Sequence, residues 1–202
     1  PEGHRRTTAR ELMRQLGDKA EARSLMARAG LPVLPGSDEA LTGPLAAQET
    51  ARLVGFPVIL KAVAGGGGRG MTVVRNPADL LRAYGQTRAH ARAIFGDERL
   101  YLERFVEDAR HVEVQVLRDT HGSTIHLGER DCSVQRRHQK LIEESPAPGL
   151  PEDLRTAVCT AAVQGAEAVG YVGAATFEFV LTPADEFYLM EINCRLQVEH
   201  PV

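Results

Sequence analysis

The chain has 202 residues, of which 43% are hydrophobic and 25% charged, a balance typical of a globular protein with one large core or two small ones. The net charge of −3 at pH 7 argues against a protein that binds nucleic acid through bulk electrostatics. No apolar stretch approaches the length of a membrane span, and no signal-peptide pattern opens the sequence. We therefore expect a cytoplasmic protein with neither nucleic acid nor a membrane as partner. Because the sequence begins with Pro1 rather than Met, we also expect a longer parent protein.

The cysteines Cys132, Cys159 and Cys194 are odd in number, widely spaced and without a CxxC pair, which is typical of a reduced protein. The seven histidines show no HExxH or other metal-ligand spacing. A zinc site or a disulfide framework is therefore not expected. Any metal would be held by oxygen ligands.

The first predicted element is a helix over residues 18–30, capped by Asp18 and ended by Gly30. The proline-rich stretch LPVLPG follows and indicates a domain boundary near Pro32. Beyond this boundary the pattern predicts an α+β lobe. Its expected elements are a helix over 46–54, strands over 58–63 and 71–74, a helix over 77–93 and a strand over 100–106.

Residues 111–117 alternate, which predicts a strand with His111, Glu113 and Gln115 on one face and valines on the other. The valine face suits a core, and the polar face suits a cleft. We expect residues 125–127 to pair with this strand, followed by a helix over 154–169 and strands over 175–181 and 187–193. The prediction is thus an α+β fold with a helical segment (1–32), a small lobe (33–105) and an incomplete large lobe (106–202).

Lysine occurs only three times among the 24 basic residues. Lys19 begins a helical pattern, Lys61 ends the apolar run PVILK, and Lys140 closes the basic run QRRHQK. A lysine is a compact point charge and an arginine a planar fork, so the two are not interchangeable at a tight anion site. We interpret the three lysines as phosphate or anion contacts; the alternative is chance. QRRHQK itself could be a solvated basic patch or a nucleic-acid contact, although its acidic flanks argue against the latter.

Between two predicted strands lies a glycine cluster of Gly65, Gly66, Gly67 and Gly68. Consecutive glycines let backbone N–H groups converge on an anion. The cluster is neither a Walker loop nor a dinucleotide fingerprint. A mobile hairpin without a ligand is one alternative, but Lys61 four residues upstream favours a flap that covers phosphates.

Two glutamates, Glu178 and Glu191, lie on the last two predicted strands. The register that is symmetric about Ala184 and Asp185 puts them directly opposite each other, where like charges destabilise a sheet. A divalent cation would remove that conflict, and Asn193, on the same face as Glu191, adds a carbonyl oxygen. This donor set suits Mg²⁺ shared with substrate phosphates. The alternative is a solvated hairpin with two exposed glutamates.

The same alternation continues through Arg195, Gln197 and Glu199, which could hold a small anion with Glu199 as a proton acceptor. The alternative is a salt-bridged edge strand. In a fully extended chain Glu199 would lie roughly 26 Å beyond Glu191, at about 3.3 Å per residue. The chain must therefore bend if Glu199 is to reach the phosphate site.

Several segments together resemble the biotin carboxylase branch of the ATP-grasp enzymes, from about Gly17 to Val202. They are KAVAGGGGRGM, HVEVQVL, ERDCSVQRRHQK, TFEF, MEIN and NCRLQVEHPV. QRRHQK together with RLQVEHP is the most specific part, since the related carbamoyl phosphate synthetases lack the RxQxEH ending. The resemblance implies ATP between two lobes, two Mg²⁺ or Mn²⁺ ions on its phosphates, bicarbonate as substrate and biotin as carrier substrate.

By position, the resemblance also implies three sets of site residues. The ATP set is Lys19, Lys61, Gly65, Gly66, Gly67, Gly68, Glu103, Arg104, Val106, His111, Gln135 and His138. The metal set is Glu178, Glu191 and Asn193. The bicarbonate set is Lys140, Arg195, Gln197, Val198 and Glu199, in which Lys140, Arg195 and Glu199 are the expected catalytic residues and Glu199 is the base.

The implied reaction activates bicarbonate with ATP to carboxyphosphate, which breaks down to CO₂ and phosphate; the phosphate deprotonates biotin, whose ureido nitrogen captures CO₂. Implied partners are a biotin carrier protein or domain, a carboxyltransferase subunit or domain, and a second copy of the full-length parent. Cys194 replaces a usual threonine, with little expected effect because it should point away from the Asn193 face. Since parts of the family's enzyme are not in this sequence, we expect the isolated chain to be inactive. The alternatives are another ATP-grasp carboxylate–amine ligase or an inactive nucleotide-binding fragment.

Overall fold

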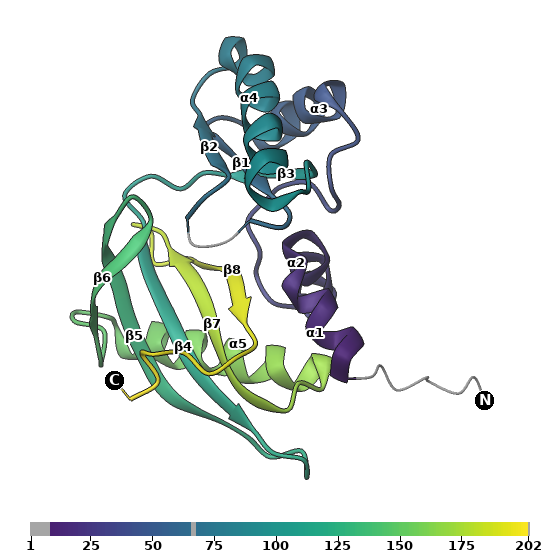
Figure 1. The fold of residues 1–202 in the computed structure, drawn as a ribbon. Coiled ribbons are helices and arrows are strands. Elements are labelled where there is room, and N and C mark those ends of the chain that lie inside the picture. Colours follow the sequence, from purple (N-terminus) through teal and green to yellow (C-terminus); the bar gives the residue numbers. More distant parts are fainter. Residues whose placement is uncertain (1–8, 66–67, 202) are drawn as a thin grey trace.

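The computed structural model describes residues 9–65 and 68–201, which form two β-sheets with accompanying helices (Figure 1). This arrangement confirms the predicted mixed α+β class. In the described part of the chain, no helix is long and apolar enough to cross a membrane. The domain bounds predicted near residues 32 and 105 stay a prediction.

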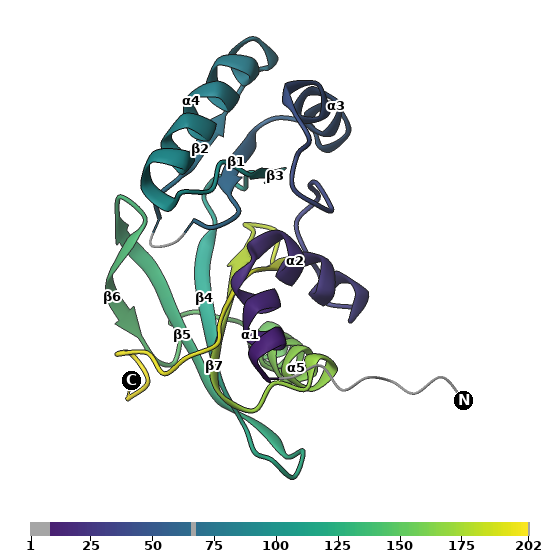
Figure 2. The ribbon, with the colours of Figure 1, turned by 45° about the vertical axis from the view of Figure 1, so that its right-hand side comes forward.

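The described part of the chain begins with helices α1 (Ala9–Gly17) and α2 (Lys19–Arg28), which lie beside the edge of the large sheet (Figure 2). Asp18 is the predicted cap of α2, and its carboxylate accepts hydrogen bonds from the backbone N–H groups of Ala20 and Glu21, each at 3.1 Å. The helix ends before Gly30, as predicted. α1 lies within the predicted helical segment 1–32 but was not predicted as a helix of its own.

The small sheet is antiparallel, with the strand order β2–β1–β3. Its strands are β1 (Val58–Ala62), β2 (Met71–Val74) and β3 (Leu100–Arg104), and helices α3 (Pro44–Val54) and α4 (Pro77–Phe95) pack with it. Asn76 caps α4 by accepting a hydrogen bond from the N–H of Asp79, and Pro77 occupies the first helical turn. All five elements were predicted, and their ends differ by a few residues at most.

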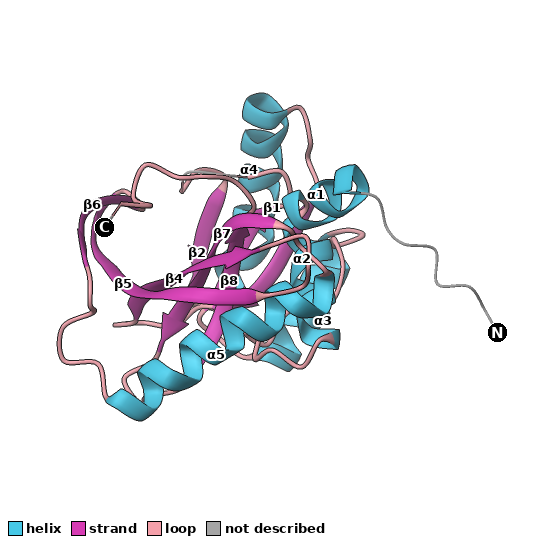
Figure 3. Ribbon diagram, turned by 90° about the horizontal axis from the view of Figure 1, so that it is seen from below, coloured by secondary structure: helices cyan, strands magenta, loops and turns pink. Residues whose placement is uncertain are grey.

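The large sheet has the order β6–β5–β4–β7–β8, and all its neighbouring strands are antiparallel. Its strands are β4 (Arg110–Arg118), β5 (Thr124–Arg136), β6 (Gln139–Glu144), β7 (Gly173–Leu181) and β8 (Phe187–Asn193). Helix α5 (Glu152–Val169) packs along one face (Figure 3). The alternation predicted for β4 is confirmed, because Val112, Val114 and Val116 are completely buried in this core. The polar face of β4 is thereby left for the site.

The β5–β6 hairpin differs most from the sequence prediction. Strand β5 was expected over residues 125–127 but extends to Arg136, and β6 was not predicted. The two turn residues, Arg137 and His138, have φ values of 53° and 61°. Two-residue hairpin turns with positive φ usually carry Gly, Asn or Asp, so neither residue signalled a turn. The run QRRHQK is thus a hairpin end whose last residue, Lys140, lies on an edge strand.

Candidate active site

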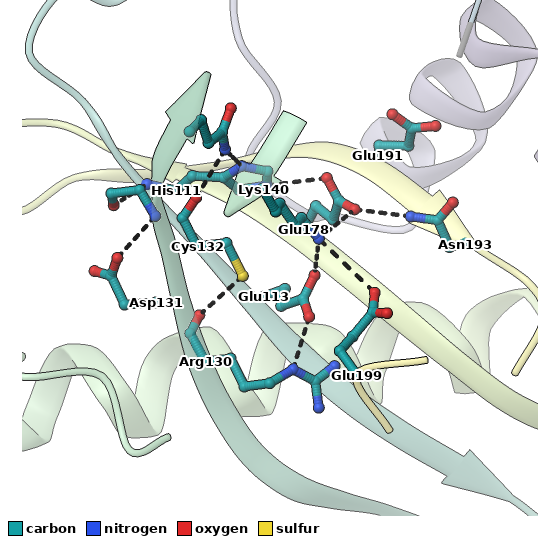
Figure 4. A network of polar contacts seen from close by, with 12 residues as sticks. His111, Glu113, Arg130, Asp131, Cys132, Lys140, Glu178, Glu191, Asn193 and Glu199 are labelled. Atoms are coloured by element: carbon teal, nitrogen blue, oxygen red, sulfur yellow. Dashed lines mark hydrogen bonds and ion pairs between the residues drawn. The ribbon is translucent and has the colours of Figure 1, made fainter. Parts of the chain in front are cut away.

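The side chain of Lys140 lies among three carboxylates that come from different parts of the large-sheet region (Figure 4). Its Nζ atom is 3.1 Å from Glu178 Oε1 on β7 and 4.0 Å from Glu199 Oε1 in the C-terminal segment, and it forms a salt bridge with Glu113 on β4. Burial alone would lower the pKa of Lys140, but the charges of Glu178 and Glu113 raise it above its usual value. This lysine therefore stays protonated and holds the three acids together.

Glu178 is the centre of a second set of contacts. Its Oε2 atom is 2.9 Å from His111 Nε2, and its Oε1 atom accepts a hydrogen bond of 2.8 Å from Asn193 Nδ2. Burial would raise the pKa of Glu178, but the close contact with His111 and the charges of His111 and Lys140 lower it to about 2. The other ring nitrogen of His111 is 2.6 Å from Gln135 Nε2. Two predicted nucleoside residues, His111 and Gln135, thus meet the predicted metal residues Glu178 and Asn193 here.

A buried arginine on β5, Arg130, supports this arrangement. Arg130 donates from Nε to Glu113 Oε1 at 2.7 Å and from Nη2 to Gln115 Oε1 at 3.2 Å. Gln115 in turn donates to the carbonyl oxygen of Ala175 at 3.1 Å. Arg130 and Glu113 are almost fully buried, so Arg130 fixes the glutamate with its other oxygen toward Lys140. Sequence reasoning missed Arg130 because it did not predict that β5 reaches this position.

The predicted opposition of Glu178 and Glu191 is confirmed, since the two are cross-strand partners. The symmetric register does not extend to the turn, because an irregularity after Glu178 shifts the remaining pairs by one residue. The two side chains turn in different directions. Glu191 forms an ion pair with Lys19 Nζ at 2.5 Å, and Figure 4 shows it apart from the contacts around Glu178. Two separate cations therefore reduce the like-charge repulsion that the sequence assigned to a metal.

The small sheet contributes one buried ion pair, between Lys61 on β1 and Glu103 on β3. The Nζ atom of Lys61 also lies 6.0 Å from the centre of the Tyr101 ring. The predicted hinge residue Arg104 donates from Nε to the carbonyl oxygen of Val54 at 3.1 Å. The remaining predicted hinge residue, Val106, is half-buried just after β3.

The glycine cluster approaches the β5–β6 hairpin. At Gly68, where φ is +73°, an added Cβ atom would lie 2.5 Å from the Cβ atom of His138, so no larger residue fits without a shift. Gly65 is also closely packed, with Ala62 as its neighbour. Gly66 and Gly67 fall outside the described residues. The predicted flap and the predicted nucleoside residue His138 thus lie side by side.

After Asn193 the chain leaves the sheet and bends across it, as the C-terminal end of the ribbon shows in Figure 1. This confirms the predicted bend and replaces the alternative of a continuous edge strand. Glu199 is buried beside Lys140, whereas Val198 is 94% exposed. Arg195 is exposed and Gln197 is half-buried, so the bicarbonate set does not converge as a whole. Cys194 packs against the core and not toward the site, as expected.

The oxygen donors of Glu178, Glu191 and Asn193 fit a hard divalent cation, which prefers carboxylate and amide oxygens. The lysines that now neutralise the two carboxylates are the ones predicted to bind anions. Glu113, Cys132 and Glu143 also lie close together, but both oxygens of Glu113 are already bound to Arg130 and Lys140. The first set is therefore the better candidate metal site.

Two surface cavities of about 480 Å³ each lie away from this cluster. One is beside α5 and the start of β8, lined by Leu154 and Phe187 among others, and the other is beside α1 and α2. Neither is lined by a predicted site residue. The charged network, and not a cavity, defines the candidate site.

The chain is similar in sequence to known proteins. The sequence profile of the family described as "Carbamoyl-phosphate synthase L chain, ATP binding domain" matches residues 18–202. The biotin carboxylase of Pseudomonas aeruginosa is 53% identical over 197 residues, which cover 95% of this chain and 43% of that protein. The chloroplastic biotin carboxylase of Arabidopsis thaliana is 50% identical over 190 residues, 94% of this chain and 35% of that protein. The chain thus spans well under half the length of these relatives.

Solved structures show the same fold. A biotin carboxylase–β,γ-ATP complex from Campylobacter jejuni has a TM-score of 0.93 and 54% identity, over 95% of this chain and 43% of that one. The biotin carboxylase domain dimer of the Hydrogenobacter thermophilus 2-oxoglutarate carboxylase, in complex with MgADP, ADP and bicarbonate, has a TM-score of 0.92 and 44% identity, over 95% of this chain and 42% of that one. The resemblance to biotin carboxylases is confirmed, and the chain belongs to the family of the carbamoyl-phosphate synthase L chain ATP-binding domain, with an ATP-grasp fold.

Proposed function

We propose that the chain is the ATP-binding segment of a biotin carboxylase, which uses ATP to activate bicarbonate for transfer to biotin. One observation carries the proposal: Lys140 holds Glu113, Glu178 and Glu199 together at the junction of three chain segments. The similarity to biotin carboxylases of known structure supports it. Among the charged side chains, Glu199 has the role of base and Lys140 that of anion contact.

In this proposal an anion beside Lys140 competes with the carboxylates for the lysine. Glu199 is the most distant of the three acids, at 4.0 Å, and is therefore the least firmly held. Its carboxylate can accept the proton of a bicarbonate held there. Arg195 and Gln197 lie on the same bent segment and would close the anion site from its outer side. General-base catalysis of this kind typically contributes about 10²–10⁴-fold.

The phosphates of ATP take Lys19 and Lys61 as partners in this proposal. Each lysine is now paired with one glutamate, so phosphate binding exchanges one anion for another without leaving a buried ammonium unpaired. Glu178, Glu191 and Asn193 would hold Mg²⁺ or Mn²⁺. When bound, such an ion neutralises charge on the transferring phosphoryl group. His111, Gln135 and His138 would border the nucleoside, and Glu103, Arg104 and Val106 the adenine.

The proposed reaction also requires partners. Biotin would reach the site on a carrier protein or domain, and a carboxyltransferase subunit or domain would consume the carboxylated product. We further propose that the full-length protein is a homodimer in the cytoplasm. The segments 1–32, 33–105 and 106–202 would act as a helical segment, a lid lobe and a base lobe.

The test is ATP turnover by the full-length protein, with and without bicarbonate and free biotin. We expect ADP formation to require bicarbonate and biotin to become carboxylated. Turnover that ignores bicarbonate and requires an amine would identify a different ATP-grasp ligase. Glu199→Gln is the matched variant, because it removes the base while it preserves the shape of the side chain.

The metal assignment has a separate test by calorimetry. The double variant Glu178→Gln, Glu191→Gln should weaken binding of Mg·ADP far more than binding of metal-free ADP. Glu152→Gln, Glu186→Gln is the matched control, since both of these glutamates are exposed and their described side-chain partners, Arg155 and Tyr188, are outside the network. Equal losses for the two ligands would contradict the metal assignment.

A further inference from the structure

Thr176 is a buried polar residue of the large sheet that no part of the mechanism above uses. It lies on β7 two residues before Glu178, so the two side chains point to the same face. Its cross-strand partner on β8 is Asn193, and the partner of Glu178 is Glu191. Thr176 and the three candidate metal ligands therefore form two successive cross-strand pairs on the same face of the sheet.

The hydroxyl group of Thr176 has no hydrogen-bond partner among the described residues, although the residue is completely buried. Buried hydroxyls are almost always hydrogen-bonded, because an unpaired one loses its water without compensation. A buried, unpaired polar atom beside a candidate ligand site indicates a partner that arrives only with the ligand.

The hydrogen bonding of the neighbouring Asn193 side chain must change when a cation binds. Its Nδ2 group now donates to Glu178 Oε1 at 2.8 Å. The NH₂ group of an amide has no free lone pair for a metal, so Asn193 can ligate a cation only through its oxygen. Turning that oxygen toward a cation held by Glu178 moves the NH₂ group away from its present acceptor. A buried NH₂ group then requires another acceptor.

We propose that Thr176 is a positioning residue for the metal site. Its hydroxyl oxygen accepts a hydrogen bond from the NH₂ group of Asn193 when the amide oxygen of Asn193 turns toward the cation. Directly opposite residues on neighbouring strands have Cβ atoms about 4.5–5.5 Å apart, within reach of these two short side chains. The hydroxyl oxygen has two lone pairs for such a bond. The inference rests on the proposed function, since it takes Asn193 as a ligand.

The experiment compares Thr176→Val with Thr176→Ser in the full-length protein, with Mn²⁺ and ADP as the probe and calorimetry as the readout. Valine preserves the shape and removes the hydroxyl, whereas serine preserves the hydroxyl. We expect Thr176→Val to weaken Mn²⁺ binding in the presence of ADP about 10-fold, the lower end of the range for residues that orient metal ligands. Thr176→Ser should bind Mn²⁺ as the unaltered protein does.

The thermal stability of Thr176→Val should not fall together with its Mn²⁺ binding. Because the hydroxyl has no partner without the ligand, Thr176→Val should match or exceed the Tm of the unaltered protein. Thr87→Val is the matched control: Thr87 is also buried, but its hydroxyl donates to Thr72 Oγ1 at 2.6 Å. This control should lower Tm and leave Mn²⁺ binding unchanged.

Each outcome decides between explanations. If the unaltered protein does not bind Mn²⁺ with ADP, the proposed function and this inference both fail. If it binds and Thr176→Val binds equally well, the inference alone is wrong. A lower Tm for Thr176→Val, or an equal loss of Mn²⁺ binding in Thr87→Val, would show that the hydroxyl has a structural role and would also overturn it.

Discussion

The small and large sheets each carry a lysine of the candidate site, buried at Lys61 and half-buried at Lys140, but they surround it differently. Lys61 in the small sheet pairs with one carboxylate, that of Glu103. Lys140 in the large sheet lies among the carboxylates of Glu113, Glu178 and Glu199. A single pair can open to admit a phosphate, whereas a lysine with three partners fixes the positions of all of them.

The two regions also differ in how many polar residues they bury. The buried polar residues described in the small-sheet region are Lys61, Thr87 and Glu103. Those of the large-sheet region are Glu113, Gln115, Glu129, Arg130, Thr176, Glu178 and Glu199. Glu129 pairs with Arg155 of α5, whereas the others lie in or beside the network around Lys140. The large sheet therefore accepts the desolvation of many polar groups and offsets it with mutual contacts. This difference predicts that changes in the large sheet affect both chemistry and folding.

The largest effect is expected from Glu199→Ala in the full-length protein. Loss of the proposed base should reduce bicarbonate-dependent ATP turnover by about 10²–10⁴-fold and leave ATP affinity nearly unchanged. Steady-state kinetics and ADP binding measure the two quantities. Weaker ATP binding with unchanged turnover would place Glu199 in the nucleotide pocket instead.

Removal of Arg130 tests whether the large sheet depends on its buried charges for folding. Arg130→Ala leaves the buried Glu113 without its arginine, which should lower the free energy of unfolding by about 3–5 kcal/mol. The measurement is denaturant unfolding. Arg52→Ala, at an exposed position of α3, is the control and should change little. If Arg130→Ala lowers the free energy of unfolding no more than Arg52→Ala does, the network adds nothing to stability.

The pH dependence of stability should depend on Glu178. Its pKa is about 2 in the folded protein and 4.5 without the fold, so its charge stabilises the protein above about pH 4.5. That contribution, about 3 kcal/mol, is lost as the pH falls from about 4.5 to about 2. Glu178→Gln should flatten the unfolding free energy over this window. An unchanged profile would mean that His111 and Lys140 do not hold this carboxylate ionised.

Exchange of lysine for arginine compares the two sheets directly. Lys140→Arg should lower bicarbonate-dependent turnover by about 10²-fold, because a planar fork cannot meet three carboxylates from one nitrogen and the acids would move. Lys61→Arg should also be damaging, but less so, since one carboxylate can accept a fork. Near-normal turnover by Lys140→Arg would show that the lysine is not selected for its geometry. Lys19→Arg should be the mildest of the three.

Local patterns in the sequence were sufficient for most elements. Neighbours within a few residues decide the cap of α2 at Asp18 and the start of α4 at Asn76 and Pro77. They also decide which face of β4 carries the buried valines. The opposition of Glu178 and Glu191 was also predicted, from the short link between their strands. The pairing is as predicted, although the register beside the link differs by one residue and an irregularity after Glu178 makes up the difference.

Contacts between distant segments were not predictable in this way. Arg130 entered the network because β5 extends past the predicted residues 125–127 and pairs it with Glu113 of β4. The hairpin that follows was missed because its two turn residues, Arg137 and His138, carry no turn signal. The sequence assigned a metal to the facing glutamates, whereas the fold brings Lys19 to Glu191 from the first helices.

The sequence by itself determined the α+β class, the family and the identity of the charged residues. It also indicated that the chain must bend after Asn193, since an extended strand would carry Glu199 too far. Only the tertiary structure decided which cation neutralises which acid. The physical reason is that pairing depends on which side chains share a buried space, and β4, β6, β7 and the C-terminal segment meet at Lys140 only after the whole sheet has formed.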